Sequence, residues 1–322
     1  MERMIAIAQE KFRLITVGSR EGDTFWPMAA LIAAVILWGA SFVAMRVAVT
    51  AIGPMAVMWC RMMIALVLIL PFAKSLVPTS YQRGDWKLLV PMVLFQPCLY
   101  FLLESNALQF TTSSQAGVIS ASVPILVTLG AAFFLSETIT VTTLAGIGLS
   151  IAGVVVLTVS AEPAGAGQNP LIGNTMEFLA MICAAGNMLI IKRLSHRYNP
   201  WGLTAMQIVA GAIFFLPGAF WLNRIPSEGW TPPLILSLIF LGGFVTFGAF
   251  GLYNWGISHT RAAKASSFIN LVPVVAVILG WAVLAESLSF RQCLAALAVI
   301  AGVMLSQMAD ARDRASGKQK AG

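Results

Sequence analysis

Arg61 is the charged side chain furthest from its usual surroundings, because it lies inside an apolar stretch that runs from Pro54 to about residue 73. It stands some seven residues into that stretch, or about 10 Å at the helical rise of 1.5 Å per residue. A charge at that depth in hydrocarbon is costly, so Arg61 is a functional hypothesis by default. The structural alternative is that it bonds helix-end carbonyls or extends to the membrane surface.

Glu104 is a second charged residue within an apolar stretch, about four residues or roughly 6 Å from its end. We expect Arg61 and Glu104 to lie at similar depth and to be able to form an ion pair, which offsets part of the cost of removing each from water. A proton that moves onto Glu104 would break the pair and could couple protons to opening. A purely structural pair is the alternative.

Gln96, Tyr100 and Glu104 recur at a spacing of four residues, which places them on one stripe of a helix. Such a stripe is expected to face protein or water. Amides and aromatic rings together suit a small solute with an amino-acid-like backbone, although each amide alone also serves as an ordinary bond between helices. The remaining candidates for a polar cavity are Trp38, Asn187, Gln207, Tyr253, Asn254 and Asn270.

The elements that position these residues are predicted from composition and hydropathy. Of the 322 residues, 58% are hydrophobic and 10% charged, which excludes a soluble protein. Stretches of about twenty apolar residues predict an all-α integral membrane protein with ten transmembrane helices. The expected spans are residues 27–49, 54–73, 87–108, 115–135, 143–159, 172–191, 200–222, 233–255, 265–285 and 291–309.

The basic residues predict the orientation of these spans. If the amino terminus is cytoplasmic, sixteen of the twenty Lys and Arg fall on the cytoplasmic side, as the positive-inside rule requires. We therefore expect a multi-pass protein of the bacterial inner membrane, with a cytoplasmic segment 1–26 and a cytoplasmic basic tail 310–322. Because the basic residues lie between apolar spans, the net charge of +7 does not indicate a nucleic-acid partner.

An internal repeat is the most specific signal in the chain. The segment from Ser105 aligns without gaps to the segment from Asn254, which superimposes Pro124 on Pro273 and Glu137 on Glu286. We expect the two glutamates to bond free backbone groups in the turns. The repeat predicts two five-helix units, 27–160 and 172–309. Because five is odd, the two units are expected to be inverted in the membrane.

These motifs resemble the drug/metabolite transporter superfamily, specifically its EamA-type ten-helix members. The resemblance covers about residues 27–308 and is carried by WGASFVAMR from Trp38, by the span that contains Arg61, and by the twin segments PILVTLGAAFFLSE and PVVAVILGWAVLAE. It implies export of amino acids, other metabolites or drugs through a central cavity between the halves. An arginine at the Arg61 position is typical of the family, whereas many members carry an apolar residue in place of Glu104.

Taken together, the sequence predicts a secondary transporter that exports amino acids or related small metabolites by alternating access, with proton coupling left open. Multidrug or toxic-compound efflux is the alternative within this class. A polytopic membrane enzyme and a non-transporting scaffold are the alternatives outside it. The expected partners are a small-molecule substrate and the lipid bilayer, a homodimer is left open, and no cofactor or metal is expected, since the four cysteines show no spacing of a metal site.

Overall fold

The computed structural model describes residues 25–76, 81–135, 141–160, 169–222, 224–226, 229–259, 265 and 268–320. All regular structure in these ranges is helical and no strand occurs among them, which confirms the all-α prediction for this part of the chain. Residues 1–24 lie outside the described residues, as does Glu137.

The first half of the chain forms one long helix followed by shorter, interrupted ones. Its elements are α2 (Phe25–Ile52), α3 (Pro54–Ile69), η1 (Leu70–Phe72), α4 (Ala73–Leu76), α5 (Trp86–Val93), η2 (Leu94–Leu99), α6 (Tyr100–Phe110), α7 (Ser113–Ser120), α8 (Val123–Leu135) and α9 (Val141–Val159). Gly53, with φ of 80°, separates α2 from α3, and Pro54 begins α3 where the missing N–H is not needed.

The second half follows the same order of long and interrupted helices. Its elements are α10 (Pro170–Leu194), α11 (Pro200–Phe214), η3 (Leu216–Gly218), α12 (Ala219–Leu222), α13 (Pro232–Ile239), η5 (Phe240–Ala249), α14 (Phe250–His259), η6 (Phe268–Asn270), α16 (Leu271–Leu284) and α17 (Phe290–Lys320). The side chains of Asn169 and Asn199 cap α10 and α11, each of which begins with proline. The predicted tail 310–322 thus continues α17 as far as Lys320.

Six stretches of the described residues are long and apolar enough to cross a membrane: Phe25–Ile52, Pro54–Phe72, Trp86–Phe110, Ser113–Gly130, Pro170–Leu194 and Pro232–His259. A seventh is Pro200–Phe214 with Leu216–Leu222, if this pair, bent by 49°, counts as one span. The shorter apolar helices Leu144–Leu157, Phe268–Leu284 and Phe290–Leu305 fall on the other three expected spans. A multi-pass membrane protein is therefore supported, and the count of ten stays a prediction.

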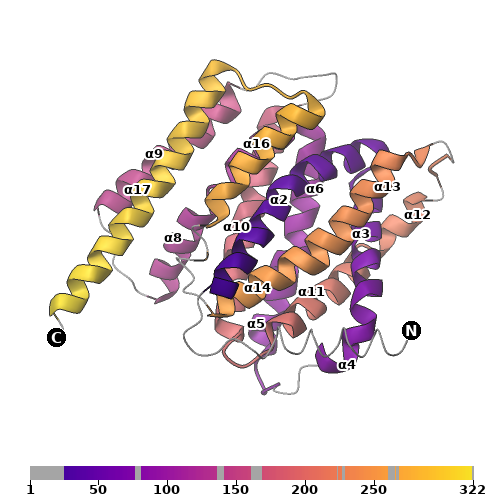
Figure 1. Ribbon diagram of the computed structural model, residues 1–322, viewed down its shortest axis with the longest axis horizontal. Coiled ribbons are helices and arrows are strands. Elements are labelled where there is room, and N and C mark those ends of the chain that lie inside the picture. Colours follow the sequence, from indigo (N-terminus) through magenta and orange to yellow (C-terminus); the bar gives the residue numbers. More distant parts are fainter. Residues whose placement is uncertain are drawn as a thin grey trace.

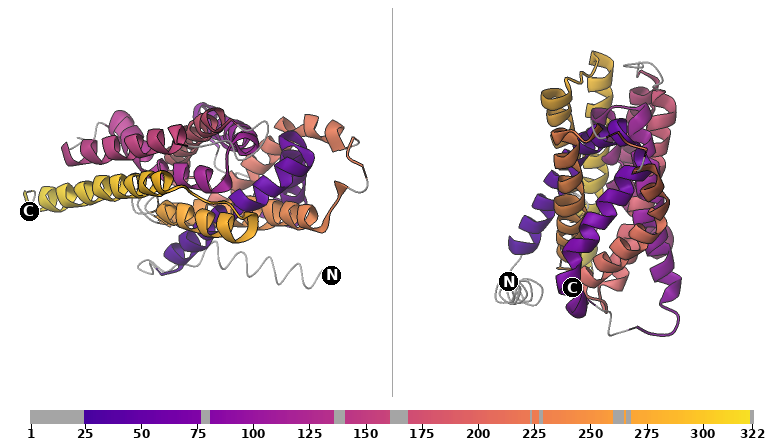
Figure 2. Two further views of the ribbon diagram at one scale, coloured as in Figure 1. Left: turned by 90° about the horizontal axis from the view of Figure 1, so that it is seen from above. Right: turned by 90° about the vertical axis from the view of Figure 1, so that its right-hand side faces the viewer.

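The helices form a bundle with one pair set to its side. In Figure 1 and in the left view of Figure 2, α9 and α17 lie side by side at one end of the molecule, beyond α8 and α10. The contact is close, because a Cβ on Gly302 would lie 2.6 Å from the backbone oxygen of Gly146. A Cβ on Gly148 would have no heavy atom of another described element within 4 Å.

Glu286, which follows α16, forms hydrogen bonds with the start of α7. Its carboxylate accepts hydrogen bonds from the backbone N–H groups of Ser113 and Ser114, both at 2.9 Å, and from both serine hydroxyls, at 2.8 and 2.7 Å. These are free N–H groups at the start of α7, where a negative charge is favourable. Glu286 therefore bonds free backbone groups as expected, but those of a helix more than 170 residues earlier in the chain.

Candidate functional site

A buried network of side-chain amides lies between the two halves of the bundle. Asn187 Nδ2 donates to Gln96 Oε1 at 2.8 Å, and Gln207 Nε2 donates to Asn187 Oδ1 at 3.0 Å and to the backbone oxygen of Gln96 at 2.9 Å. Asn254 Nδ2 donates to Thr204 Oγ1 at 2.9 Å and to Gln207 Oε1 at 3.3 Å. Four residues predicted as separate cavity candidates thus form one network.

The network depends on a break in the third helix of the first half. Gln96 has φ of −145° and ψ of 121°, which are extended values, so the helix stops there and resumes at Pro97. The freed carbonyl of Gln96 is the group that accepts from Gln207. The predicted stripe through Gln96, Tyr100 and Glu104 is therefore wrong at Gln96, because the backbone leaves the helix before proline. It holds for the other two residues, which bond each other.

Two cavities meet at Gln96. The smaller one is lined by residues of α3, η2, α6, α11, η5 and α14, among them Gln207 and Thr246. The larger one is lined by residues of α2, η2, α6, α7, α8, α10, α14, η6 and α16, among them Trp38 and Tyr100. Gln96 and Phe250 line both cavities, so these two side chains form the partition between them.

Aromatic rings surround this partition. Trp38 lies 5.3 Å from Phe250 and 4.7 Å from Tyr253, measured between ring centroids, and Phe101 meets Phe250 edge-on at 5.6 Å. The indole N–H of Trp38 is buried and has no hydrogen-bond partner. Tyr253 directs its hydroxyl to Met188 Sδ at 3.7 Å. Trp38 and Tyr253 therefore belong to one aromatic wall, with an unused donor at its centre.

Arg61 is buried among side chains and does not extend to the membrane surface. It is 1% exposed, its Nε donates to Thr246 Oγ1, and its Cζ lies 4.1 Å from the centroid of the Phe101 ring. Its Nη1 has no hydrogen-bond partner. The guanidinium therefore faces the protein interior with donor capacity to spare.

Glu104 is 4% exposed and accepts a hydrogen bond of 2.6 Å from the Tyr100 hydroxyl. The ion pair considered for Arg61 and Glu104 does not form: the ion pair found among the described residues joins Arg197 to Asp85. Arg61 and Glu104 still interact through their charges. The Glu104 carboxylate is therefore bonded by the Tyr100 hydroxyl and not, as the sequence predicted, by the guanidinium of Arg61.

The sequence of this chain matches the model of a known protein family. The model of the EamA-like transporter family matches residues 25–159 and residues 171–308. The chain belongs to this family. Its relatives are named as transporters, so we treat it below as an EamA-like transporter.

Two of these relatives match nearly along their whole length. An uncharacterized transporter of Archaeoglobus fulgidus is 31% identical over 285 residues, which cover 87% of this chain and 97% of the relative. The uncharacterized transporter YoaV of Bacillus subtilis is 26% identical over 283 residues, which cover 87% and 96%. A crystal structure with 17% sequence identity superposes with a TM-score of 0.62 and covers 88% of this chain and 97% of its own, which shows a shared fold.

Several residues of this transporter's site were not found from the sequence. Thr204, Thr246 and Phe101 carried no signal, because such residues are common in apolar helices. Glu177, which lines neither cavity, did carry a signal, because it is an acidic residue within the apolar helix α10. Asn270, by contrast, was predicted but does not line either cavity, and its buried Oδ1 has no hydrogen-bond partner.

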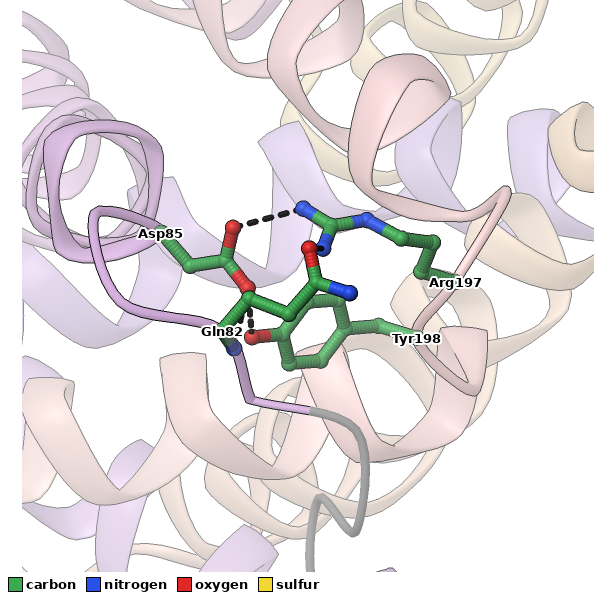
Figure 3. A network of polar contacts seen from close by, with 4 residues as sticks. All are labelled: Gln82, Asp85, Arg197 and Tyr198. Carbon is green, nitrogen blue, oxygen red and sulfur yellow. Dashed lines mark hydrogen bonds and ion pairs between the residues drawn. The ribbon is translucent and has the colours of Figure 1, made fainter.

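A second polar contact joins the halves of the transporter at one end of the bundle (Figure 3). Arg197 donates to Asp85 Oδ1 at 2.6 Å, and the hydroxyl of Tyr198 donates to Asp85 Oδ2 at 2.7 Å. The backbone N–H of Gln82 also donates to Asp85 Oδ2, at 2.9 Å, and Arg197 bonds the side chain of Gln82. We call these four residues the latch. The hydrogen bond from Tyr198 is the main cause that lowers the pKa of Asp85.

Proposed function

We propose that this EamA-like transporter exports amino acids or related small polar metabolites across the bacterial inner membrane by alternating access. The observation that carries the proposal is the amide network at the partition between two cavities. Side-chain amides offer both donors and acceptors, which suits a solute that carries a carboxylate and an ammonium group. The supply of free hydrogen-bonding groups around the network, at Trp38 and Arg61, favours a polar ligand over a sealed core.

The network also bridges the two halves. Gln96 belongs to the first half, whereas Asn187, Gln207 and Asn254 belong to the second. If one cavity is to open while the other closes, the halves must move against each other at this partition. A solute that bonds the amides can replace the bonds between the halves and so favour the movement.

We propose ten spans in two inverted five-helix units as the frame for this movement. Matching features in the two halves support it. The second helix of each half ends in a 3₁₀ turn, Leu70–Phe72 and Leu216–Gly218. The third helix of each half is irregular, with the break at Gln96 in the first half and the π-helical segment Phe240–Ala249 in the second. The family model also matches the two halves separately.

Efflux of aromatic or otherwise apolar toxic compounds is a second candidate. The wall formed by Trp38, Phe250 and Tyr253 favours it, because aromatic faces bind flat apolar molecules without demanding hydrogen bonds. A membrane enzyme has less support: within the described residues, no group of three or more His, Cys, Asp or Glu side chains could hold a metal ion.

The proposal is tested by measuring how well bacterial strains tolerate candidate substrates. A deletion strain and an overexpressing strain are challenged with amino acids, nucleosides, toxic amino-acid analogues and aromatic drugs. We expect overexpression to raise tolerance to amino-acid analogues. Asn187→Leu should abolish this gain, whereas Asn106→Leu should keep it, because the Asn106 amide bonds a carbonyl of its own helix, that of Leu102. Tolerance to aromatic drugs alone would favour the second candidate, and no change with any compound would refute both.

A further inference from the structure

Glu177 is the most deeply buried acidic residue that the structure describes, and the site above does not use it. It lies on α10, one turn after Asn174, and is 0% exposed. Both of its carboxylate oxygens lack a hydrogen-bond partner. An ionised carboxylate in such a position would lose its hydration and gain nothing in return.

The register of α10 against α6 places Glu177 beside Glu104. A Cβ on Gly173 would lie 3.0 Å from the backbone oxygen of Ala107, and one on Gly186 would lie 2.7 Å from the ring of Phe95. The two segments therefore run antiparallel, and Glu177 falls opposite the turn that contains Glu104. The charges of the two carboxylates repel each other.

The two carboxyl groups have different surroundings. Glu104 accepts the hydrogen bond from Tyr100 and feels the positive charge of Arg61, so both neighbours favour its ionised form. Glu177 has neither a donor nor a cation in contact. When two carboxyl groups share a buried site, the one without partners retains the proton.

The other ionisable groups near α10 do not change this assignment. In the described part of the chain, α7, α8 and α9 carry no ionisable group. Arg46 of α2 donates to the backbone oxygens of Leu108 and Thr111, and its charge interacts with that of Glu286. The groups contributed by the remaining packed elements and by α10 itself are Lys87, Cys98, Tyr100, Cys183, Lys192, Arg193, Tyr253 and His259. Of these, Tyr100 bonds Glu104, Tyr253 faces Met188, and Lys192 donates to the backbone oxygen of Ile257.

We propose that Glu177 holds a proton in this conformation and that Glu177 and Glu104 together form the proton-coupling site of the transporter. The inference rests on the proposed transport function and assigns its coupling ion. It moves the titrating group from Glu104, where the sequence placed it, to a residue on the facing helix.

The charge balance explains the coupling. With Glu104 ionised, Glu177 protonated and Arg61 charged, the site is neutral and can stay closed to water. When water reaches Glu177, its O–H bond breaks and the proton passes to water, which leaves two carboxylates against one guanidinium. This net negative charge disfavours closure, and the site closes again once Glu177 takes up a proton or an ammonium-bearing solute supplies the missing positive charge.

The proton can be observed without a known substrate. A protonated carboxyl group in a dry site gives an infrared C=O band that an ionised group lacks, and we expect the purified transporter in lipid nanodiscs to show it at neutral pH. Glu177→Gln and Glu177→Met should both lose the band, and Met serves as a second variant because it fills the space without a polar atom. The control Glu286→Gln should retain it. A band that survives both Glu177 substitutions would overturn the assignment.

Transport separates this inference from the proposed function. In proteoliposomes loaded with a mixture of amino acids, wild type should exchange labelled amino acids and accumulate them when a pH gradient is imposed. Glu177→Gln should retain exchange and lose the gradient-driven accumulation. If wild type exchanges amino acids but ignores the gradient, proton coupling is wrong and transport stands. If wild type exchanges none of them, the proposed function fails while the infrared band still reports on Glu177.

Discussion

Asp85 and Arg197, 112 residues apart in the sequence, form an ion pair of 2.6 Å that joins the two halves of the transporter. The Tyr198 hydroxyl donates to the second oxygen of the same carboxylate (Figure 3). Asp85, which directly precedes α5, is therefore bonded by two consecutive residues that follow α10. A pair with this geometry is stronger than an ordinary surface ion pair, because one carboxylate accepts several charge-assisted and neutral bonds at once. The latch therefore links the two halves at this end of the bundle.

Loss of the latch is expected to open this end of the transporter. In a cysteine-free background, Ile208→Cys places a probe in the smaller cavity, where Ile208 is buried. Adding Asp85→Asn should raise the rate of maleimide labelling roughly tenfold, since it removes the charge that holds Arg197. As a control, a cysteine at the exposed Tyr81 should label equally fast with and without Asp85→Asn. Equal labelling of Ile208→Cys in both backgrounds would show that the latch does not control access.

The latch should also depend on pH in a defined direction. The pKa of Asp85 is lowered, mainly by the Tyr198 hydrogen bond, so its stabilising effect is present above the ordinary carboxyl pKa and is lost as pH falls through the lowered value. Burial and the bond to Asp85 raise the pKa of Tyr198 to about 12, so its contribution is lost as pH rises above its ordinary value of 10.0 toward 12.

The rate at which Ile208→Cys is labelled, divided by the rate for Tyr81→Cys at the same pH, should accordingly stay low between these two limits and rise in acid and in strong base. The ratio is needed because the reactive thiolate fraction itself changes with pH. Tyr198→Phe removes the donated bond, so it should move the rise in acid to higher pH and abolish any rise in base that comes from the phenol. A pH profile that Tyr198→Phe leaves unchanged would contradict this account of the latch.

The amide network is expected to contribute to stability as well as to binding. Gln207→Leu should lower the free energy of unfolding by about 1–3 kcal/mol, because the carbonyl of Gln96 and the amide of Asn187 lose their partner. Asn106→Leu, outside the network, should change it by less than about 0.5 kcal/mol. Thermal unfolding in detergent measures both. Combining Gln207→Leu with Asn187→Leu should cost less than the sum of the single substitutions, since they share one hydrogen bond.

Part of this site was predictable from the sequence, and the reason is chemical. Gln96, Asn187, Gln207 and Asn254 are amides in apolar stretches, and such groups must find partners inside the protein. That they meet each other depends on how the helices are arranged, which hydropathy does not specify. The break at Gln96 could have been predicted, because the residue before Pro97 is disfavoured in a helix.

Glu177 could not be identified as a site residue from hydropathy. A single acidic residue in a helix of 25 residues leaves the average apolar, so α10 was identified as a span without regard to it. What makes Glu177 notable is the absence of a partner for both oxygens, which depends on the register between α10 and α6. The pairing of Glu104 failed for a related reason: helical spacing placed Tyr100 one turn away, and this nearer donor took the position expected for Arg61.

Arg61 is expected to be needed for transport and not for membrane insertion. Arg61→Ala removes the positive charge that acts on Glu104, so transport should fall by about tenfold or more. Arg61→Lys restores the charge but not the planar contact with Phe101 and should recover part of the rate. Thr246→Val, which removes the hydrogen-bond acceptor of Arg61 and the donor to the backbone oxygen of Leu241 but keeps the positive charge, is the matched control and should have a smaller effect. Normal export by Arg61→Ala, at an unchanged amount in the membrane, would exclude Arg61 from the mechanism.

The two chain ends are expected on the same, cytoplasmic, face of the membrane. Each half contains an odd number of proposed spans, so the second half must lie inverted relative to the first, and the total is even. Fluorescent-protein fusions at both ends should glow, because the fluorophore matures in the cytoplasm, whereas alkaline phosphatase fused at either end should be inactive. Fusions after Gly53 and after Arg224, between proposed spans on the outer face, should give the reverse pattern and serve as internal controls. Ends on opposite faces would leave an odd number of spans, and two inverted copies of one five-helix unit do not produce an odd number.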